Sequence, residues 1–127
     1  MTLAVLDTTV IIHLSRKNQA AINWLASQQD TFAITPITWM EVMVGVANKN
    51  AQTDSFNLLS SFEMQYLMPV DMDWAMQQMS AYHFSKGVGV MDCFMASVCN
   101  RLNLPIYTHN LKDYLKILPP SLVVQPY

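Results

Sequence analysis

The sequence predicts an α/β fold: a three-layer α/β/α sandwich with a central, mostly parallel sheet. Short apolar runs of strand length alternate with segments of helical apolar spacing along the whole chain. Strands joined by helices pair in parallel through right-handed crossovers, which place helices on both faces of the sheet. Because 127 residues suit one domain and no linker or repeat is present, we expect residues 1–127 to form a single domain.

The first half of the chain predicts two strands that each lead into helices. Leu3–Leu6 is a short apolar run, and Asp7-Thr8-Thr9 then gives a helix-start signal. Residues 21–25 have helical apolar spacing, and Thr31–Ile34 predicts the second strand. The helix expected from Ile37 to about Val46 is preceded by a proline that suits its first turn.

The second half predicts three helices and three strands by the same patterns. The expected helices cover residues 53–65, 74–84 and 90–102. The expected strands cover residues 66–70, 105–107 and 123–124. Lys86-Gly87-Val88-Gly89 separates the last two helices, and Asp71 with Asp73 predicts a helix start on a solvated surface.

The composition is rich in apolar residues and poor in charge. Hydrophobic residues make up 52% and charged residues 13% of the chain, which excludes a disordered polypeptide. Because so few charges cannot cover a lone monomer, we expect part of the apolar surface, which includes ten methionines, to face a partner or a second copy. The net charge of -2 gives no general positive field, so a nucleic-acid ligand must be held locally.

Further features predict a soluble, cytoplasmic protein. No apolar run approaches the roughly 20 residues that span a bilayer, and the N-terminal residues do not resemble a secretory signal. Cys93 and Cys99 stand in one apolar stretch, at a spacing that suits neither a metal clamp nor a redox pair. They predict buried thiols in a reducing compartment.

Three carboxylates stand in apolar surroundings. Asp7, Glu41 and Asp92 are each the only charge among apolar neighbours. A buried carboxylate carries a large desolvation cost unless it is neutralised, paired or exposed at a cavity. No basic residue lies inside these windows, so local ion pairing does not explain the pattern, although Arg16 or Lys86 could reach in from a distance.

The predicted topology brings acids to one edge of the sheet. Asp7 follows the first strand, and Glu41 lies in the helix after the second. Asp92 opens a helix, and Asp113 follows the strand that ends near residue 108. In an open parallel sheet the ligand crevice lies at the carboxyl ends of the strands. Because clustered carboxylates repel one another and a hard divalent cation relieves this, the implied ion is Mg²⁺ or Mn²⁺.

Other common site signatures are missing from the sequence. His13, His83 and His109 are far apart in the sequence with no thiol grouped near them, so zinc spacing is absent. Gly87-Val88-Gly89 lacks the third glycine of a dinucleotide loop and predicts a turn.

Helix capping is the alternative role for each acid. Asp7 suits an N-cap, and Glu41 suits a capping box with Thr38. Asp92 suits a first-turn acid, and Asp113 suits a cap together with Asn110, three residues earlier. Their joint occurrence in windows that otherwise resemble a core favours a shared site, because caps lie at ordinary solvent-exposed helix ends.

Four ordered blocks each carry one of the acids. They are Leu6-Asp7-Thr8-Thr9-Val10-Ile11, Ile37-Thr38-Trp39-Met40-Glu41-Val42-Met43-Val44-Gly45, Gly89-Val90-Met91-Asp92-Cys93-Phe94-Met95-Ala96 and Thr108-His109-Asn110-Leu111-Lys112-Asp113-Tyr114. In order and approximate spacing they resemble the PIN-domain nucleases, most of all the VapC toxins of bacterial and archaeal toxin–antitoxin pairs. The resemblance covers essentially the whole chain.

The resemblance implies a PIN-like fold and an endonuclease that cuts RNA with Mg²⁺ or Mn²⁺. It implies that one acidic cluster is catalytic and binds the metal, directly or through water: Asp7, Glu41, Asp92 and Asp113. Thr9 matches the family's hydroxyl position beside the first acid, and Asn110 matches the asparagine that accompanies the last. It also implies a homodimer and a cognate antitoxin whose tail lies over the active-site groove.

Basic residues in loops near the acid blocks are the candidates to bind RNA phosphates. They are Arg16, Lys17, Lys86 and Lys112. The chain departs from the family in its bulky, apolar helix start at Met91–Met95 and in its few arginines. These departures bear on catalytic rate and RNA affinity rather than on the fold.

Two other functions remain open at the level of the sequence. One is a non-catalytic, partner-binding module on the same fold, in which the acid cluster is residual. The other is an aspartyl-phosphate protein, either a haloacid dehalogenase-type phosphatase or a receiver domain, phosphorylated on Asp7. It fits less well, because the phosphatase needs a second Asp where Thr9 stands, and the position of the acid and the missing lysine do not suit a receiver.

Overall fold

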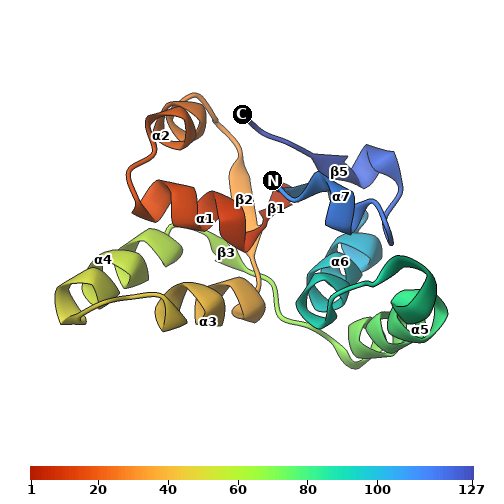
Figure 1. Cartoon of the computed structure of the whole chain (residues 1–127). Helices are drawn as coiled ribbons and strands as arrows, with labels where there is room; N and C mark the ends of the chain where they lie inside the picture. The colour runs from red at the N-terminus through yellow and green to blue at the C-terminus, as the bar shows by residue number, and fades with distance from the viewer.

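Five parallel strands form the sheet at the centre of the protein (Figure 1). The computed structural model describes residues 1–127. The strands are β1 (Thr2–Leu6), β2 (Thr31–Ile34), β3 (Glu63–Met64), β4 (Ile106–Tyr107) and β5 (Val123–Val124). Their order is β3-β2-β1-β4-β5, and every neighbouring pair is parallel. The predicted parallel α/β sheet is therefore confirmed, with β1 at its centre.

Helices connect the strands and form the two outer layers (Figure 1). They are α1 (Thr8–Ser15), α2 (Gln19–Ala26), α3 (Pro36–Val44), α4 (Lys49–Leu59), α5 (Pro69–Lys86), α6 (Val90–Leu102) and α7 (Leu111–Tyr114), with a 3-10 turn at Pro120–Leu122. None of these helices combines the length and apolar character that crossing a membrane requires.

The side-chain alternation of the strands divides the core between the two faces of the sheet. Ala4 and Leu6 of β1 pack with buried side chains of α1 to α4. Val5, which lies between them, packs on the other face with α6 and with Tyr114 of α7. Figure 1 shows α1 to α4 on one side of the sheet and α5 to α7 on the other. The predicted three-layer sandwich is confirmed.

The third strand lies earlier in the chain than predicted. Residues 66–70 do not form a strand; β3 is Glu63–Met64, paired with the end of β2. The preceding helix also shifts, because Asn48 caps α4 by accepting from the Ala51 N–H at 2.8 Å. Pro69 has no N–H for a strand ladder and instead occupies the first turn of α5. The expected strand is therefore a connection and a helix start.

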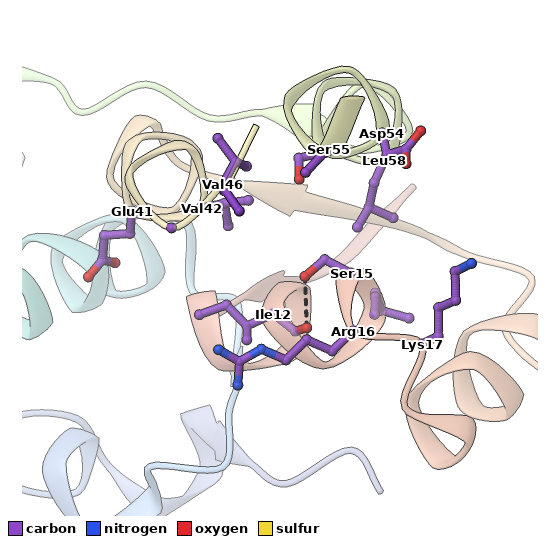
Figure 2. A pocket seen from close by; sticks show the side chains of 14 residues that line it. Ile12, Ser15, Arg16, Lys17, Glu41, Val42, Val46, Asp54, Ser55 and Leu58 are labelled. Atoms are coloured by element: carbon purple, nitrogen blue, oxygen red, sulfur yellow. Dashed lines mark hydrogen bonds between the residues drawn. The ribbon is translucent and has the colours of Figure 1, made fainter. Parts of the chain in front are cut away.

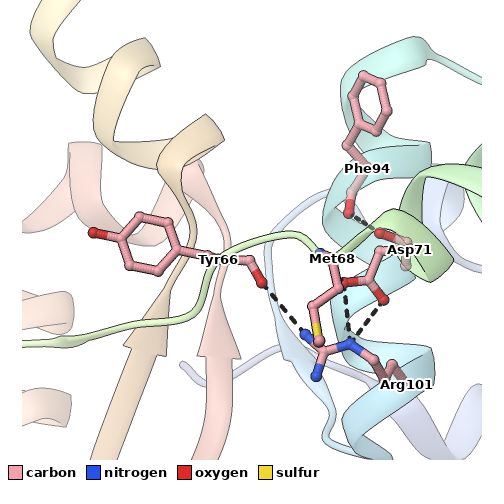
Figure 3. Close-up of polar contacts among 6 residues, drawn as sticks. Tyr66, Met68, Asp71, Phe94 and Arg101 are labelled. Carbon is pink, nitrogen blue, oxygen red and sulfur yellow. Dashed lines mark hydrogen bonds and ion pairs between the residues drawn. The ribbon is translucent and has the colours of Figure 1, made fainter.

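The start of α5 is also less exposed than predicted. Asp71 is 1% exposed rather than solvated, and its carboxylate accepts from the Met68 N–H at 2.8 Å (Figure 3). Its oxygens also bind the Arg101 Nε of α6, at 2.9 and 3.0 Å. One buried carboxylate thus caps α5 and joins it to α6. Asp73 is exposed, as predicted.

The two cysteines lie on α6 as buried free thiols, which agrees with the prediction. Burial raises the pKa of the Cys99 thiol to about 12. Cys99 therefore remains a neutral core side chain near neutral pH.

Candidate active site

Asp7 is the most buried of the four predicted acids. It follows β1 directly and is 5% exposed. The Tyr114 hydroxyl donates to its Oδ1 at 2.9 Å, while the hydroxyls of Thr108 and Thr9 donate to its Oδ2 at 2.7 and 3.1 Å. Asp7 occupies the N-cap position of α1, but its side chain makes no capping hydrogen bond. Its carboxylate is thus held by hydroxyls from three segments.

Glu41 lies in the middle of α3 and is exposed. Thr35 caps this helix, so the capping box of Glu41 with Thr38 is not formed. The Thr8 hydroxyl donates to Glu41 Oε1 at 2.6 Å instead, and it lies 3.1 Å from the Thr38 hydroxyl. This contact joins the start of α1 to α3.

Asp92 lies in the first turn of α6 and is half-buried. Its side chain makes no capping hydrogen bond at the helix start. Burial and the carboxylates of Asp113, Asp7 and Glu41 raise the pKa of Asp92 to about 6, and the nearby Tyr114 hydroxyl counteracts part of this rise. The other three predicted acids therefore all act electrostatically on this one carboxyl group.

Asp113 is the one predicted acid that has a basic partner. It lies on α7, and its Oδ1 is 3.3 Å from the Lys116 Nζ. Asn110 stands at the N-cap position of α7 without a side-chain capping bond, and its N–H donates to the Thr108 hydroxyl at 2.9 Å. The sequence reasoning missed Lys116, which follows Asp113 by one helical turn.

The site carries excess negative charge. The salt bridges of the protein join Arg101 to Asp71 and Lys116 to Asp113. Asp7, Glu41 and Asp92 form no ion pair with any basic side chain. Neither Arg16 nor Lys86 reaches in to neutralise them.

The donor chemistry of these acids fits a hard divalent cation. All the donors are carboxylate oxygens, which Mg²⁺ and Mn²⁺ prefer. The mutual repulsion that raises the pKa of Asp92 is the kind of strain that a bound cation relieves. As the side chains stand, no group of three His, Cys, Asp or Glu residues is arranged to hold one metal ion.

A cavity of about 600 Å³ opens between α1, α3 and α4 (Figure 2). Glu41 lines it, together with Arg16 and Lys17 at the end of α1. The two other predicted phosphate contacts lie elsewhere. The Lys86 Nζ is 4.4 Å from the centre of the Tyr82 ring, and Lys112 is exposed on α7.

Sequence reasoning missed Thr108 and Tyr114. Thr108 directly follows β4, a position that could have suggested a site residue. Tyr114 gave no such signal, because a tyrosine on a short amphipathic helix suits a core equally well. Burial and the nearby Asp7 carboxylate raise the pKa of Tyr114, so its hydroxyl keeps its proton and acts as a donor.

Two histidines that are distant in sequence meet beside the site. The ring centroids of His13 and His109 are 4.9 Å apart, and His13 Nδ1 lies 2.8 Å from the Tyr127 hydroxyl. The His109 N–H donates to the Thr9 hydroxyl at 3.3 Å. Burial and the neighbouring His13 lower the pKa of His109.

A comparison with protein families decides the assignment. The family model described as PIN domain matches residues 4–114, which includes all four acids. The chain belongs to the PIN domain family. Its family and its fold class thus agree with the resemblance seen in the sequence.

Solved structures resemble this PIN domain over nearly its full length. A toxin–antitoxin complex from Klebsiella pneumoniae contains a chain 27% identical, with a TM-score of 0.78 and 98% coverage of both chains. VapBC2 from Rickettsia felis, bound to a promoter DNA fragment, gives 22% identity, a TM-score of 0.80 and 98% coverage of both. DNA-bound VapBC from Salmonella typhimurium gives 21% identity, a TM-score of 0.78 and 98% coverage of both chains. No curated protein matches the sequence.

Proposed function

We propose that this PIN domain is a metal-dependent endoribonuclease that acts as the toxin of a VapBC-type toxin–antitoxin pair. One observation carries the proposal: Asp92 is half-buried and its pKa is raised by burial and by three other carboxylates, from segments far apart in the sequence. Three of these four acids have no basic partner. A fold gains nothing in stability from such repulsion, so a cationic ligand is its natural explanation.

Asp7, Glu41, Asp92 and Asp113 would hold the ion, Mg²⁺ or Mn²⁺. When bound, it supplies Lewis-acid polarisation of the phosphodiester and a lowered pKa of bound water. The protein prepares its carboxylates with hydroxyl donors: Thr9 orients Asp7, and Thr8 orients Glu41. Asn110 stands beside the last acid, one residue before α7.

RNA is the proposed substrate, and basic side chains near the acids would bind its phosphates. Arg16 and Lys17 line the same cavity as Glu41, which makes them the best placed of the four predicted contacts (Figure 2). Lys86 and Lys112 would extend the phosphate track beyond this cavity. The net charge of -2 fits binding by such local contacts rather than by a general positive field.

A cognate antitoxin and a second copy are the proposed protein partners. The Klebsiella pneumoniae relative was solved in a toxin–antitoxin complex, and it is similar to this chain over 98% of its length. The charged fraction of 13% and the exposed apolar residues of α5 and α6 support a further contact between two copies. A cytoplasmic location accords with this function.

Replacement of one central acid tests the proposal. The wild-type protein is expected to cleave members of a panel of structured RNAs with Mg²⁺ or Mn²⁺ and to lose this activity in EDTA. Asp7→Asn is expected to abolish cleavage, because an amide cannot replace the charged ligand. Circular dichroism checks that the variant remains folded. Asp73→Asn is the matched control, since Asp73 is exposed on α5.

Three outcomes separate the alternatives. Full cleavage by folded Asp7→Asn contradicts the assignment of the site. A wild-type protein that neither binds Mn²⁺ in calorimetry nor cleaves RNA, yet dimerises, indicates a non-catalytic partner-binding module. Incorporation of phosphate from a small phosphodonor would support the aspartyl-phosphate alternative. Membership of the PIN domain family argues against that alternative, because Asp7 lies within the residues that match the PIN domain model.

A further inference from the structure

Tyr114 combines a core position with a polar contact in the site. Its side chain is 1% exposed and belongs to the core on the α6 face of the sheet. Its hydroxyl passes beyond this apolar packing and donates to Asp7 Oδ1 at 2.9 Å. A phenylalanine would fill almost the same volume, so core packing alone does not require the hydroxyl group.

The contact controls one particular oxygen of Asp7. Oδ2 receives two hydroxyl donors, from Thr108 and Thr9, whereas Oδ1 receives only the Tyr114 hydroxyl. The two threonines can satisfy Oδ2 over a range of carboxylate rotations, but the third bond fixes the plane of the group.

We propose that Tyr114 is a positioning residue, whose hydroxyl sets the orientation of the Asp7 carboxylate for binding the divalent cation. This inference rests on the proposed function, because it concerns the same site. Tyr114 acts through Asp7 and does not itself contact the metal. Hydrogen-bond donors to a ligating carboxylate typically contribute ten- to a hundred-fold to metal affinity, roughly the effect expected here.

The test compares Tyr114→Phe with a matched variant, Tyr66→Phe. Tyr66 is 68% exposed in the connection between β3 and α5, and its hydroxyl makes no hydrogen bond. We expect Tyr114→Phe to weaken Mn²⁺ binding by about ten-fold or more in calorimetry at 25 °C. At saturating Mn²⁺ we expect a lower kcat with little change in the KM for RNA, because the phosphate contacts are untouched. Tyr66→Phe should match the wild type.

Folding and function are read separately. Circular dichroism at 25 °C checks that metal-free Tyr114→Phe is folded. In a folded variant, a purely structural role would leave the Mn²⁺ affinity unchanged. An unchanged Mn²⁺ affinity with unchanged cleavage would overturn the inference while leaving the proposed nuclease intact. A wild-type protein that neither binds Mn²⁺ nor cleaves RNA would overturn both. If Tyr114→Phe is unfolded, the hydroxyl is needed for folding itself, and this outcome also overturns the inference that it only positions Asp7.

Discussion

Asp92 carries its negative charge in surroundings that disfavour it. Its pKa of about 6, against an ordinary value of 3.8, results from burial first and then from Asp113, Asp7 and Glu41. The folded protein therefore binds a proton on Asp92 more tightly than the unfolded chain does. The ionised group lowers stability, and this penalty is absent below about pH 3.8 and complete above about pH 6.

We expect Asp92→Asn to raise the Tm of the metal-free protein near pH 7.5, because the amide removes a repelled charge. The increase should shrink as the pH falls through about 6 and vanish near 3.8, where Asp92 is neutral in both states. Thermal unfolding in EDTA from pH 4 to 8 measures this, with Asp73→Asn as control. A lower Tm at pH 7.5 would contradict the electrostatic account.

At the scale of single residues, the sequence indicates the acids but only some of the hydroxyls that hold them. Asp7, Glu41 and Asp92 were identifiable as lone charges among apolar neighbours, although Glu41 is exposed in the structure, and Thr9 was identifiable as the hydroxyl beside the first acid. Tyr114 was not, since its partner Asp7 lies far away in the sequence and only the folded protein joins them. The roles of the four acids in metal binding remain predictions.

An ion pair with a buried carboxylate joins helices α5 and α6. Asp71 accepts from the N–H at the start of α5 and from the Arg101 guanidinium of α6 (Figure 3). The side chain of Asp71 is 1% exposed and that of Arg101 is 25% exposed. A buried carboxylate left without its cation is strongly destabilising.

Arg101→Met is expected to lower the free energy of unfolding by about 3 kcal/mol, since it leaves Asp71 charged and unpaired. Urea denaturation measures the change. The double variant Asp71→Asn/Arg101→Met should recover much of it, because the neutral amide can still accept from the Met68 N–H. Lys112→Met is the control, an exposed basic residue outside any ion pair. Equal stability of Arg101→Met and the wild type would refute this role.

The same helix start explains the error in the predicted third strand. The apolar residues among positions 66–70 suit a strand. In the structure, however, the Met68 N–H binds the Asp71 carboxylate at the start of α5 and is not available for pairing with a strand. Strand β3 instead uses Glu63 and Met64, and its position follows from pairing with β2. Two-residue strands carry too little alternation to be located from the sequence alone.

At the scale of the whole molecule, the apolar composition reappears as an exposed surface. Met76 of α5 and Val90 of α6 line one apolar hollow, and they are 60% and 54% exposed. Their exposure agrees with the expectation that a chain with 13% charged residues leaves part of its apolar surface exposed as a monomer. The alternation of strands and helices predicted the layers, whereas nothing in the sequence located this hollow.

We expect the protein to sediment as a dimer at micromolar concentration, with this hollow in the interface. Met76→Lys or Val90→Lys should shift it to the monomer, because burying an unpaired ammonium opposes association. Analytical ultracentrifugation measures the mass. Phe56→Lys on α4 is the control, since Phe56 is also 56% exposed but lies outside the hollow. A wild-type monomer would rule out this interface.

The central place of β1 has a consequence for biosynthesis. Asp7 is translated about a hundred residues before Thr108 and Tyr114, which hold its carboxylate. One edge of strand β1 also remains unpaired until β4 has been translated. A nascent polypeptide that ends before these residues lacks two of the donors that hold the Asp7 carboxylate, so the proposed nuclease activity would begin only once translation has passed Tyr114.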